Sequence, residues 1–148
     1  MQDALDPHQR GLDFEKLLNT LFVLFDMEPR TAYVLEREQI DGSLTFDTDD
    51  YLLEAKWWLK PVGRSEGDVF AAKVRRKGKN ALGLFVSVSG FTADFKEEYA
   101  HSTPFITMDG GDIYAVLDRL VRLDDLLQAK RRFANETGSC FMPLANVV

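Results

Sequence analysis

The segment Glu54-Ala55-Lys56 places an acid and an ammonium two residues apart in a run of apolar and aromatic residues. The run extends from Tyr51 to Trp58, and its composition predicts a β-strand. Since successive side chains of a strand point to opposite faces, Glu54 and Lys56 share one face, roughly 6.6 Å apart along the strand. Such a carboxylate can bind a hard divalent cation, and such a lysine can orient water and offset charge on a phosphate. A solvated ion pair is the alternative interpretation.

Two further acids are candidates to complete a metal site, because one carboxylate alone does not hold Mg²⁺. Asp41 precedes Glu54 by thirteen residues, at a strand end that a hairpin can return beside Glu54. Asp41-Gly42 is also a typical hairpin turn, and the two interpretations are compatible. Glu15 lies one turn from Leu18, at the edge of the apolar face of an expected first helix. It is either a metal ligand or a boundary residue whose carboxylate reaches water.

Positive charge is concentrated in one segment of an otherwise acidic chain. The 148 residues contain 18 basic and 24 acidic side chains, a net charge of −6. Residues 56–79 contain 8 basic and 2 acidic side chains, a net of +6, whereas residues 1–55 carry −9 and residues 80–148 carry −3. A local basic segment is typical of a surface that binds a polyanion, and a solvated helix face is the alternative.

Length and composition favour one globular domain, with 45% hydrophobic and 28% charged residues. The single cysteine, Cys140, excludes an internal disulfide framework and a four-cysteine zinc site. No apolar run approaches the roughly 20 residues that a membrane span needs, and no basic-then-apolar leader opens the chain. We therefore expect no membrane partner and a cytoplasmic location.

Hydrophobic periodicity predicts helices near residues 8–26, 65–77, 92–100 and 113–133, and strands near 33–35, 44–46, 51–58, 82–88 and 105–108. The segment 65–68 (SEGD) has the form of a capping box, and Thr92 is expected to cap the third helix. This order of elements predicts an α/β fold, a mixed sheet with helices on both faces. Residues 1–134 are expected to form the domain, and residues 135–148 a loosely structured C-terminal tail.

Several segments, in this order, resemble the catalytic domain of Mrr-type restriction endonucleases, which belong to the PD-(D/E)xK nuclease superfamily. The resemblance covers about residues 10–118 and is carried by segments 10–15 (RGLDFE), 40–42 (IDG), 53–56 (LEAK), 83–92 (GLFVSVSGFT) and 106–110 (ITMDG). It implies a restriction endonuclease-like core with a four- or five-stranded mixed sheet. It also implies Mg²⁺-dependent hydrolysis of phosphodiester bonds, with Mn²⁺ as a substitute metal. The implied substrate is DNA, with RNA as an open alternative, and the implied role is defence or restriction.

The resemblance assigns roles to single residues. Asp41, Glu54 and Lys56 correspond to the catalytic residues, and Glu15, Asp41 and Glu54 to the metal ligands. Ile40 stands where the motif that names the superfamily has proline. The basic segment is expected to bind backbone phosphates through Lys73, Arg75, Arg76, Lys77 and Lys79, with Lys73 nearest the scissile phosphate. For the last four, cations that suit the dipole of a helix C-terminus are the alternative interpretation.

Two other hypotheses stay open from the sequence. The first is a catalytically silent nucleic-acid-binding or assembly module that retains the nuclease fold, as the acidic net charge suggests. The second is a nuclease that is idle until a regulatory or targeting partner domain, subunit or oligomer activates it. A homodimer is also expected if the substrate is a duplex, because cutting both strands needs two sites.

Overall fold

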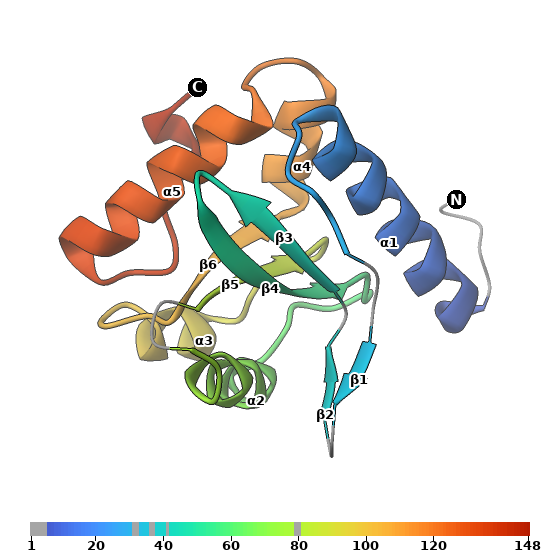
Figure 1. Cartoon of the computed structure of the whole chain (residues 1–148). Coiled ribbons are helices and arrows are strands. Elements are labelled where there is room, and N and C mark those ends of the chain that lie inside the picture. Colours follow the sequence, from blue (N-terminus) through green and yellow to red (C-terminus); the bar gives the residue numbers. More distant parts are fainter. Residues whose placement is uncertain (1–5, 31–32, 36–37, 41, 79–80) are drawn as a thin grey trace.

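The computed structural model describes residues 6–30, 33–35, 38–40, 42–78 and 81–148. Its centre is a sheet in which the strand order is β3-β4-β5-β6 (Figure 1). β3 (Gly42–Phe46) is antiparallel to β4 (Asp49–Lys56), and β4, β5 (Leu82–Ser87) and β6 (Phe105–Asp109) are parallel. The predicted α/β class with a mixed sheet is thereby confirmed, and the sheet has four strands in the described part of the chain.

Helices cover both faces of this sheet (Figure 1). α1 (Pro7–Leu24), α4 (Gly110–Leu117) and α5 (Leu123–Thr137) pack on one face, and α2 (Arg64–Arg75) and α3 (Ala93–Glu98) pack on the other. A short 3₁₀ turn, η1 (Leu144–Asn146), follows near the C-terminus. Among the residues described, no helix combines the length and the apolar composition that crossing a membrane requires.

The side chains of β4 alternate between the two cores, as the sequence predicts. Tyr51 and Leu53 are buried in the core shared with α1 and α5, and Ala55 is half-buried against the same core, as is Trp57 just after the strand. Leu52 is buried in the core on the side of α2. This alternation fixes which β4 side chains face α2, and it therefore positions the residues at the end of the strand.

The hairpin turn expected at Asp41-Gly42 is wrong. β1 (Tyr33–Leu35) and β2 (Glu38–Ile40) form a two-stranded antiparallel sheet, and Ser43 pairs with Arg30 in the same register that pairs Tyr33 with Ile40. β2 and β3 therefore run in one direction. Asp41 itself lies outside the described residues.

The reversal into β4 occurs at Asp47 and Thr48, between the paired residues Phe46 and Asp49. Both residues have positive φ, 51° and 69°. Positive φ at both central positions is the geometry that joins antiparallel strands through a two-residue turn. The hairpin β3–β4 therefore forms without a glycine at the turn.

The predicted helix caps are confirmed at one helix and wrong at another. Thr92 caps α3, since its hydroxyl accepts a hydrogen bond from the backbone N–H of Phe95. The capping box expected at Ser65–Asp68 is wrong, because α2 already begins at Arg64 and has no side-chain cap. Asp68 pairs instead with Arg64, one helical turn earlier, at 3.7 Å.

The single helix expected over residues 113–133 is wrong, since α4 and α5 replace it. Arg119 has a φ of 61°. The backbone N–H of Leu120 donates to the carbonyl of Ala115 at 2.8 Å, and that of Arg119 donates to Val116 at 3.1 Å. These two bonds are the Schellman motif that ends a helix, here with arginine in the position that glycine usually takes.

The chain after residue 134 packs on the domain, which differs from the loosely structured tail expected for residues 135–148. α5 continues to Thr137, and Cys140 and Met142 are buried. The Thr107 hydroxyl of β6 donates a hydrogen bond to the carbonyl of Cys140 at 2.8 Å. Apolar burial and this bond therefore hold the segment that follows α5.

Candidate active site

Glu54 and Lys56 lie at the carboxyl end of β4, beyond its last pairing with β3. On the β3 side, the pairing ends with Gly42 opposite Leu53. On the β5 side, it continues until Lys56 is opposite Ser87. In the described part of the chain, this end of β4 is therefore paired with a strand of the main sheet along one edge only.

The two side chains share a face, as the alternation predicts. Lys56 Nζ lies 3.3 Å from Glu54 Oε2, and the side chains are 27% and 10% exposed. Lys56 Nζ also lies 5.3 Å from the centre of the Trp58 ring, within the range of a cation–π contact. Because water is largely excluded around the carboxylate, these charges interact more strongly than they would on an open surface.

Lys73 of α2 is the third member of this group. Its Nζ lies 3.6 Å from Glu54 Oε1, and its side chain is 15% exposed. We refer to Glu54, Lys56 and Lys73 as the Glu54 cluster. Two ammoniums flank one carboxylate, so the three side chains together carry a charge of +1.

The contact between Lys73 and Glu54 was not predicted from the sequence, which assigns Lys73 to a phosphate. The periodicity of α2 contains a signal for it. Phe70 and Val74, three residues before and one after, are buried against the sheet. Since residues three and four apart share a helix face, a lysine at position 73 lies at the edge of that buried face.

Three further candidate phosphate ligands, Arg75, Arg76 and Lys77, lie at the C-terminal end of α2. Arg75 and Arg76 are exposed, and Lys77 is half-buried beside a groove of about 390 Å³ that Arg30 also lines. Lys79 lies outside the described residues. These positions suit both contact with a polyanion and interaction with the helix dipole.

Glu15 approaches β4 from the side of α1. It is half-buried and lines a cavity of about 470 Å³ together with Leu53. α1 is fixed against the end of β4 by Arg10, whose Nε donates to the carbonyl of Trp57 at 3.1 Å. Leu53 faces the core on the α1 side, whereas Glu54 faces α2. The structure thus brings Glu54, Lys56 and Lys73 together, and it places Glu15 at a neighbouring cavity.

The predicted three-acid metal site remains a prediction. No group of three or more His, Cys, Asp or Glu side chains is arranged to hold an ion within residues 6–30, 33–35, 38–40, 42–78 and 81–148. Asp41, the second predicted ligand, lies outside these ranges. Among the described residues, the candidate active site therefore consists of Glu54 and the two lysines beside it.

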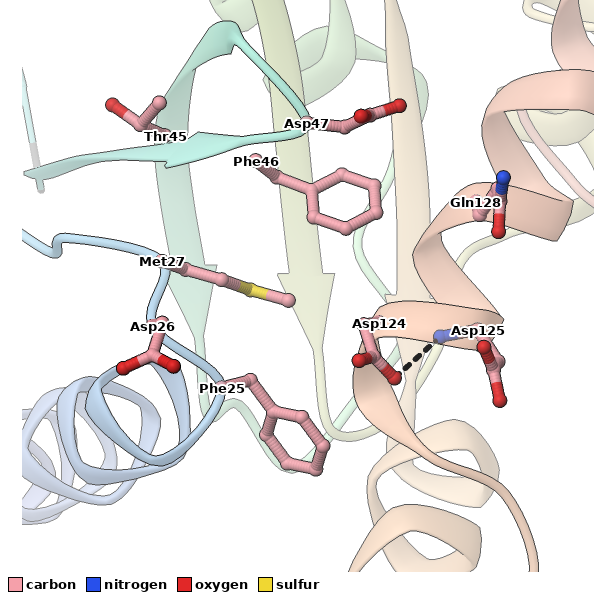
Figure 2. A pocket seen from close by; sticks show the side chains of 9 residues that line it. All are labelled: Phe25, Asp26, Met27, Thr45, Phe46, Asp47, Asp124, Asp125 and Gln128. Carbon is pink, nitrogen blue, oxygen red and sulfur yellow. Dashed lines mark hydrogen bonds between the residues drawn. The ribbon is translucent and has the colours of Figure 1, made fainter.

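A separate acidic pocket of about 330 Å³ lies beside the turn from β3 to β4 (Figure 2). Four aspartates line it: Asp26, Asp47, Asp124 and Asp125. Apolar side chains, which include Phe25, Met27 and Phe46, form part of its lining as well. Two of the four are paired with arginines. Arg122 donates two hydrogen bonds to Asp124 and thereby lowers the pKa of that carboxyl, and Arg131 pairs with Asp47. The pocket shares no residue with the Glu54 cluster.

A comparison with protein families identifies the kind of domain. The model of the family Mrr_cat, described as restriction endonuclease, matches residues 7–117. The chain belongs to the Mrr-type restriction endonuclease family. The matched Mrr-type region extends from α1 to α4, and it includes the four-stranded sheet, Glu15 and the whole Glu54 cluster. Searches of curated proteins and of solved structures gave no match. Membership of the Mrr-type family makes this chain a nuclease domain.

Proposed function

We propose that this chain is a metal-dependent endonuclease that hydrolyses phosphodiester bonds of DNA as a defence or restriction effector. The observation that carries the proposal is the ion pair between Lys56 Nζ and Glu54 Oε2, 3.3 Å apart at the end of β4. The pair belongs to a chain of the Mrr-type family. An acid and an ammonium held side by side on a rigid strand suit the binding of a cation and the stabilisation of charge on a phosphate.

The metal in this proposal is Mg²⁺, with Mn²⁺ as a substitute, and its ligands are Glu15, Asp41 and Glu54. All three supply carboxylate oxygens, the donors that these hard cations prefer, so the donor set fits the ion. Gly42 follows Asp41 in sequence and pairs with Leu53, which precedes Glu54, and this register supports a site shared by the two acids. When bound, the ion would supply Lewis-acid stabilisation and an activated water.

Lys56 is the proposed catalytic lysine, which orients the attacking water and offsets charge on the phosphate. Glu54 and the Trp58 ring, at 3.3 Å and 5.3 Å, hold its ammonium near the end of the strand. Its side chain is accessible enough to meet a substrate, yet largely shielded from water. This shielding strengthens the attraction between the ammonium and a phosphate oxygen.

DNA is the proposed substrate, and the cations around the end of α2 are its proposed binding surface. Arg75, Arg76, Lys77 and Lys79 would neutralise backbone phosphates, which sets affinity and register but carries no sequence information. Cutting both strands of a duplex needs two sites. We therefore propose that the domain acts as a homodimer or with a regulatory or targeting partner, in the cytoplasm where foreign DNA is met.

The experiment that tests this proposal is incubation of the purified protein with supercoiled plasmid and with RNA, in Mg²⁺ and in EDTA. We expect cleavage of the plasmid in Mg²⁺ and none in EDTA. Loss of a catalytic proton-transfer or charge-stabilising group typically costs about 10²-fold or more, so Lys56→Ala should slow cleavage by at least that factor. Lys60→Ala removes an exposed lysine four residues away and should cleave as the wild type does.

Equal cleavage by the wild type and by Lys56→Ala would come from a contaminating nuclease and would overturn the proposal. Salt-dependent DNA binding without hydrolysis in Mg²⁺ or Mn²⁺ would instead support the catalytically silent binding module. The net charge of −6 is the observation that favours this second function, because an acidic domain binds a polyanion weakly.

A further inference from the structure

α2 presents two kinds of cation. Arg75 and Arg76 are exposed, whereas the side chain of Lys73 is 15% exposed and lies beside the buried residues Phe70 and Val74. A cation that binds the backbone of a nucleic acid must meet phosphates at the molecular surface. Lys73 therefore differs from Arg75 and Arg76, because its side chain is largely buried and theirs are exposed.

Both oxygens of Glu54 contact ammoniums that come from different elements. Lys56, on the same strand, lies 3.3 Å from Oε2, and Lys73, on α2, lies 3.6 Å from Oε1. A twist of the carboxylate about its terminal bond would therefore change both contacts at once. The helix residue thus adds a contact to the second oxygen of an acid whose first oxygen is contacted from its own strand.

The charges of the Glu54 cluster allow its two lysines to have different roles. The Glu54 side chain is 10% exposed, and burial of a carboxylate is costly unless opposite charge and hydrogen bonds compensate for the lost water. With two ammoniums beside it, one can turn toward a phosphate while the other still pairs with the acid. Lys56 is the more exposed of the two, so it is the one that reaches a substrate.

We propose that Lys73 is a positioning residue of the nuclease site, which holds Glu54 in place and leaves Lys56 available for the reaction. The inference rests on the proposed function and deepens it. It replaces the sequence-based assignment of Lys73 to a backbone phosphate. A residue that acts through Glu54 should affect turnover, whereas a phosphate contact should affect DNA binding and its dependence on salt.

The first measurement is DNA binding in EDTA, by fluorescence anisotropy with a short labelled duplex at several NaCl concentrations. Each lost phosphate contact reduces the slope of log Kd against log salt by about 0.9. We expect Lys73→Met to keep the wild-type slope and Arg75→Ala to reduce it by about 0.9. A slope reduced by that amount in Lys73→Met would overturn the proposal, because the lysine would then be a phosphate ligand.

The second measurement is the kinetics of plasmid cleavage in Mg²⁺. Loss of a group that orients a metal-binding side chain typically costs about 10- to 100-fold in activity, so Lys73→Met should lower kcat by that factor and leave KM unchanged. Lys73→Arg keeps a positive charge beside Glu54 and should recover a large part of kcat. Lys60→Ala is the matched control for loss of a lysine and should change neither constant. A raised KM with an unchanged kcat in Lys73→Met would contradict the positioning role.

The experiments separate the role of Lys73 from the nuclease activity of the chain. If the wild type cleaves and Lys73→Met cleaves with the same kcat, only the role of Lys73 is overturned. If the wild type does not cleave, the proposed function is overturned, and the salt slope decides whether Lys73 contacts phosphate. If circular dichroism shows that Lys73→Met does not fold, Lys73→Gln takes its place with the same expectations.

Discussion

Lys130 and Asp112 form a buried ion pair whose loss should destabilise the whole fold. Lys130 Nζ of α5 lies 3.0 Å from Asp112 Oδ2 of α4, and the two side chains are 1% and 4% exposed. The same Asp112 oxygen accepts a hydrogen bond from the backbone N–H of Asp109 at 3.0 Å, which is one half of the capping box that begins α4. Lys130→Met removes the ammonium and leaves the carboxylate buried, a change that costs about 3–5 kcal/mol in comparable pairs.

The stability of Lys130→Met should depend on pH because of the Asp112 carboxyl. Burial raises the pKa of its carboxyl, and the Lys130 ammonium opposes that rise. A carboxyl whose pKa is higher in the folded than in the unfolded state stabilises the fold at low pH, and this contribution is lost as pH rises through the folded-state pKa. Without Lys130 the folded-state pKa rises further. The loss in the free energy of unfolding of Lys130→Met, relative to the wild type, should therefore be larger near neutral pH than at about pH 5.

Urea denaturation followed by circular dichroism measures the free energy of unfolding of both proteins. We expect a deficit of about 3–5 kcal/mol near neutral pH, which corresponds to a fall in Tm of roughly 10 °C for a chain of this length. Arg132→Met removes an exposed cation from the same helix and should change the free energy by less than about 0.5 kcal/mol. If Lys130→Met is as stable as the wild type near neutral pH, the buried Asp112 carboxylate does not depend on the Lys130 ammonium.

Two further predictions concern other parts of the fold. Thr92→Ala removes the hydroxyl that caps α3 and should lower the free energy of unfolding by about 1 kcal/mol in urea denaturation; an unchanged value would show that the cap contributes nothing. Burial raises the pKa of the Cys140 thiol to about 12. A thiol reagent near pH 8 should therefore label Cys140 only after unfolding in urea, and rapid labelling of the native protein would contradict its burial.

The parts of the fold that follow from local patterns could be predicted from the sequence. The composition of Tyr51 through Trp58 predicts a strand, and the alternation of side chains along a strand places Glu54 and Lys56 on one face of β4. Thr92 is a typical N-cap, and it caps α3. In both cases the local preference and the packing agree, so the sequence contains the whole explanation.

The parts that depend on backbone geometry or on distant partners could not be predicted. Arg119 adopts a left-handed conformation that ends α4, and nothing marks an arginine for that conformation. Asp41-Gly42 reads as a hairpin turn, yet pairing of Ser43 with Arg30 keeps β2 and β3 in one direction. The contact between Lys73 and Glu54 joins residues of a helix and a strand, so only the packing of α2 on the sheet reveals it.

The position of a bound metal ion decides whether Glu54 belongs to a catalytic metal site. A crystal structure of the protein with Mn²⁺, with data collected where manganese scatters anomalously, locates the ion. We expect an anomalous peak bound by the Glu54 carboxylate, with Asp41 and Glu15 as further ligands. An ion found only in the acidic pocket of Figure 2, or no ion at Glu54 at saturating Mn²⁺, would contradict it.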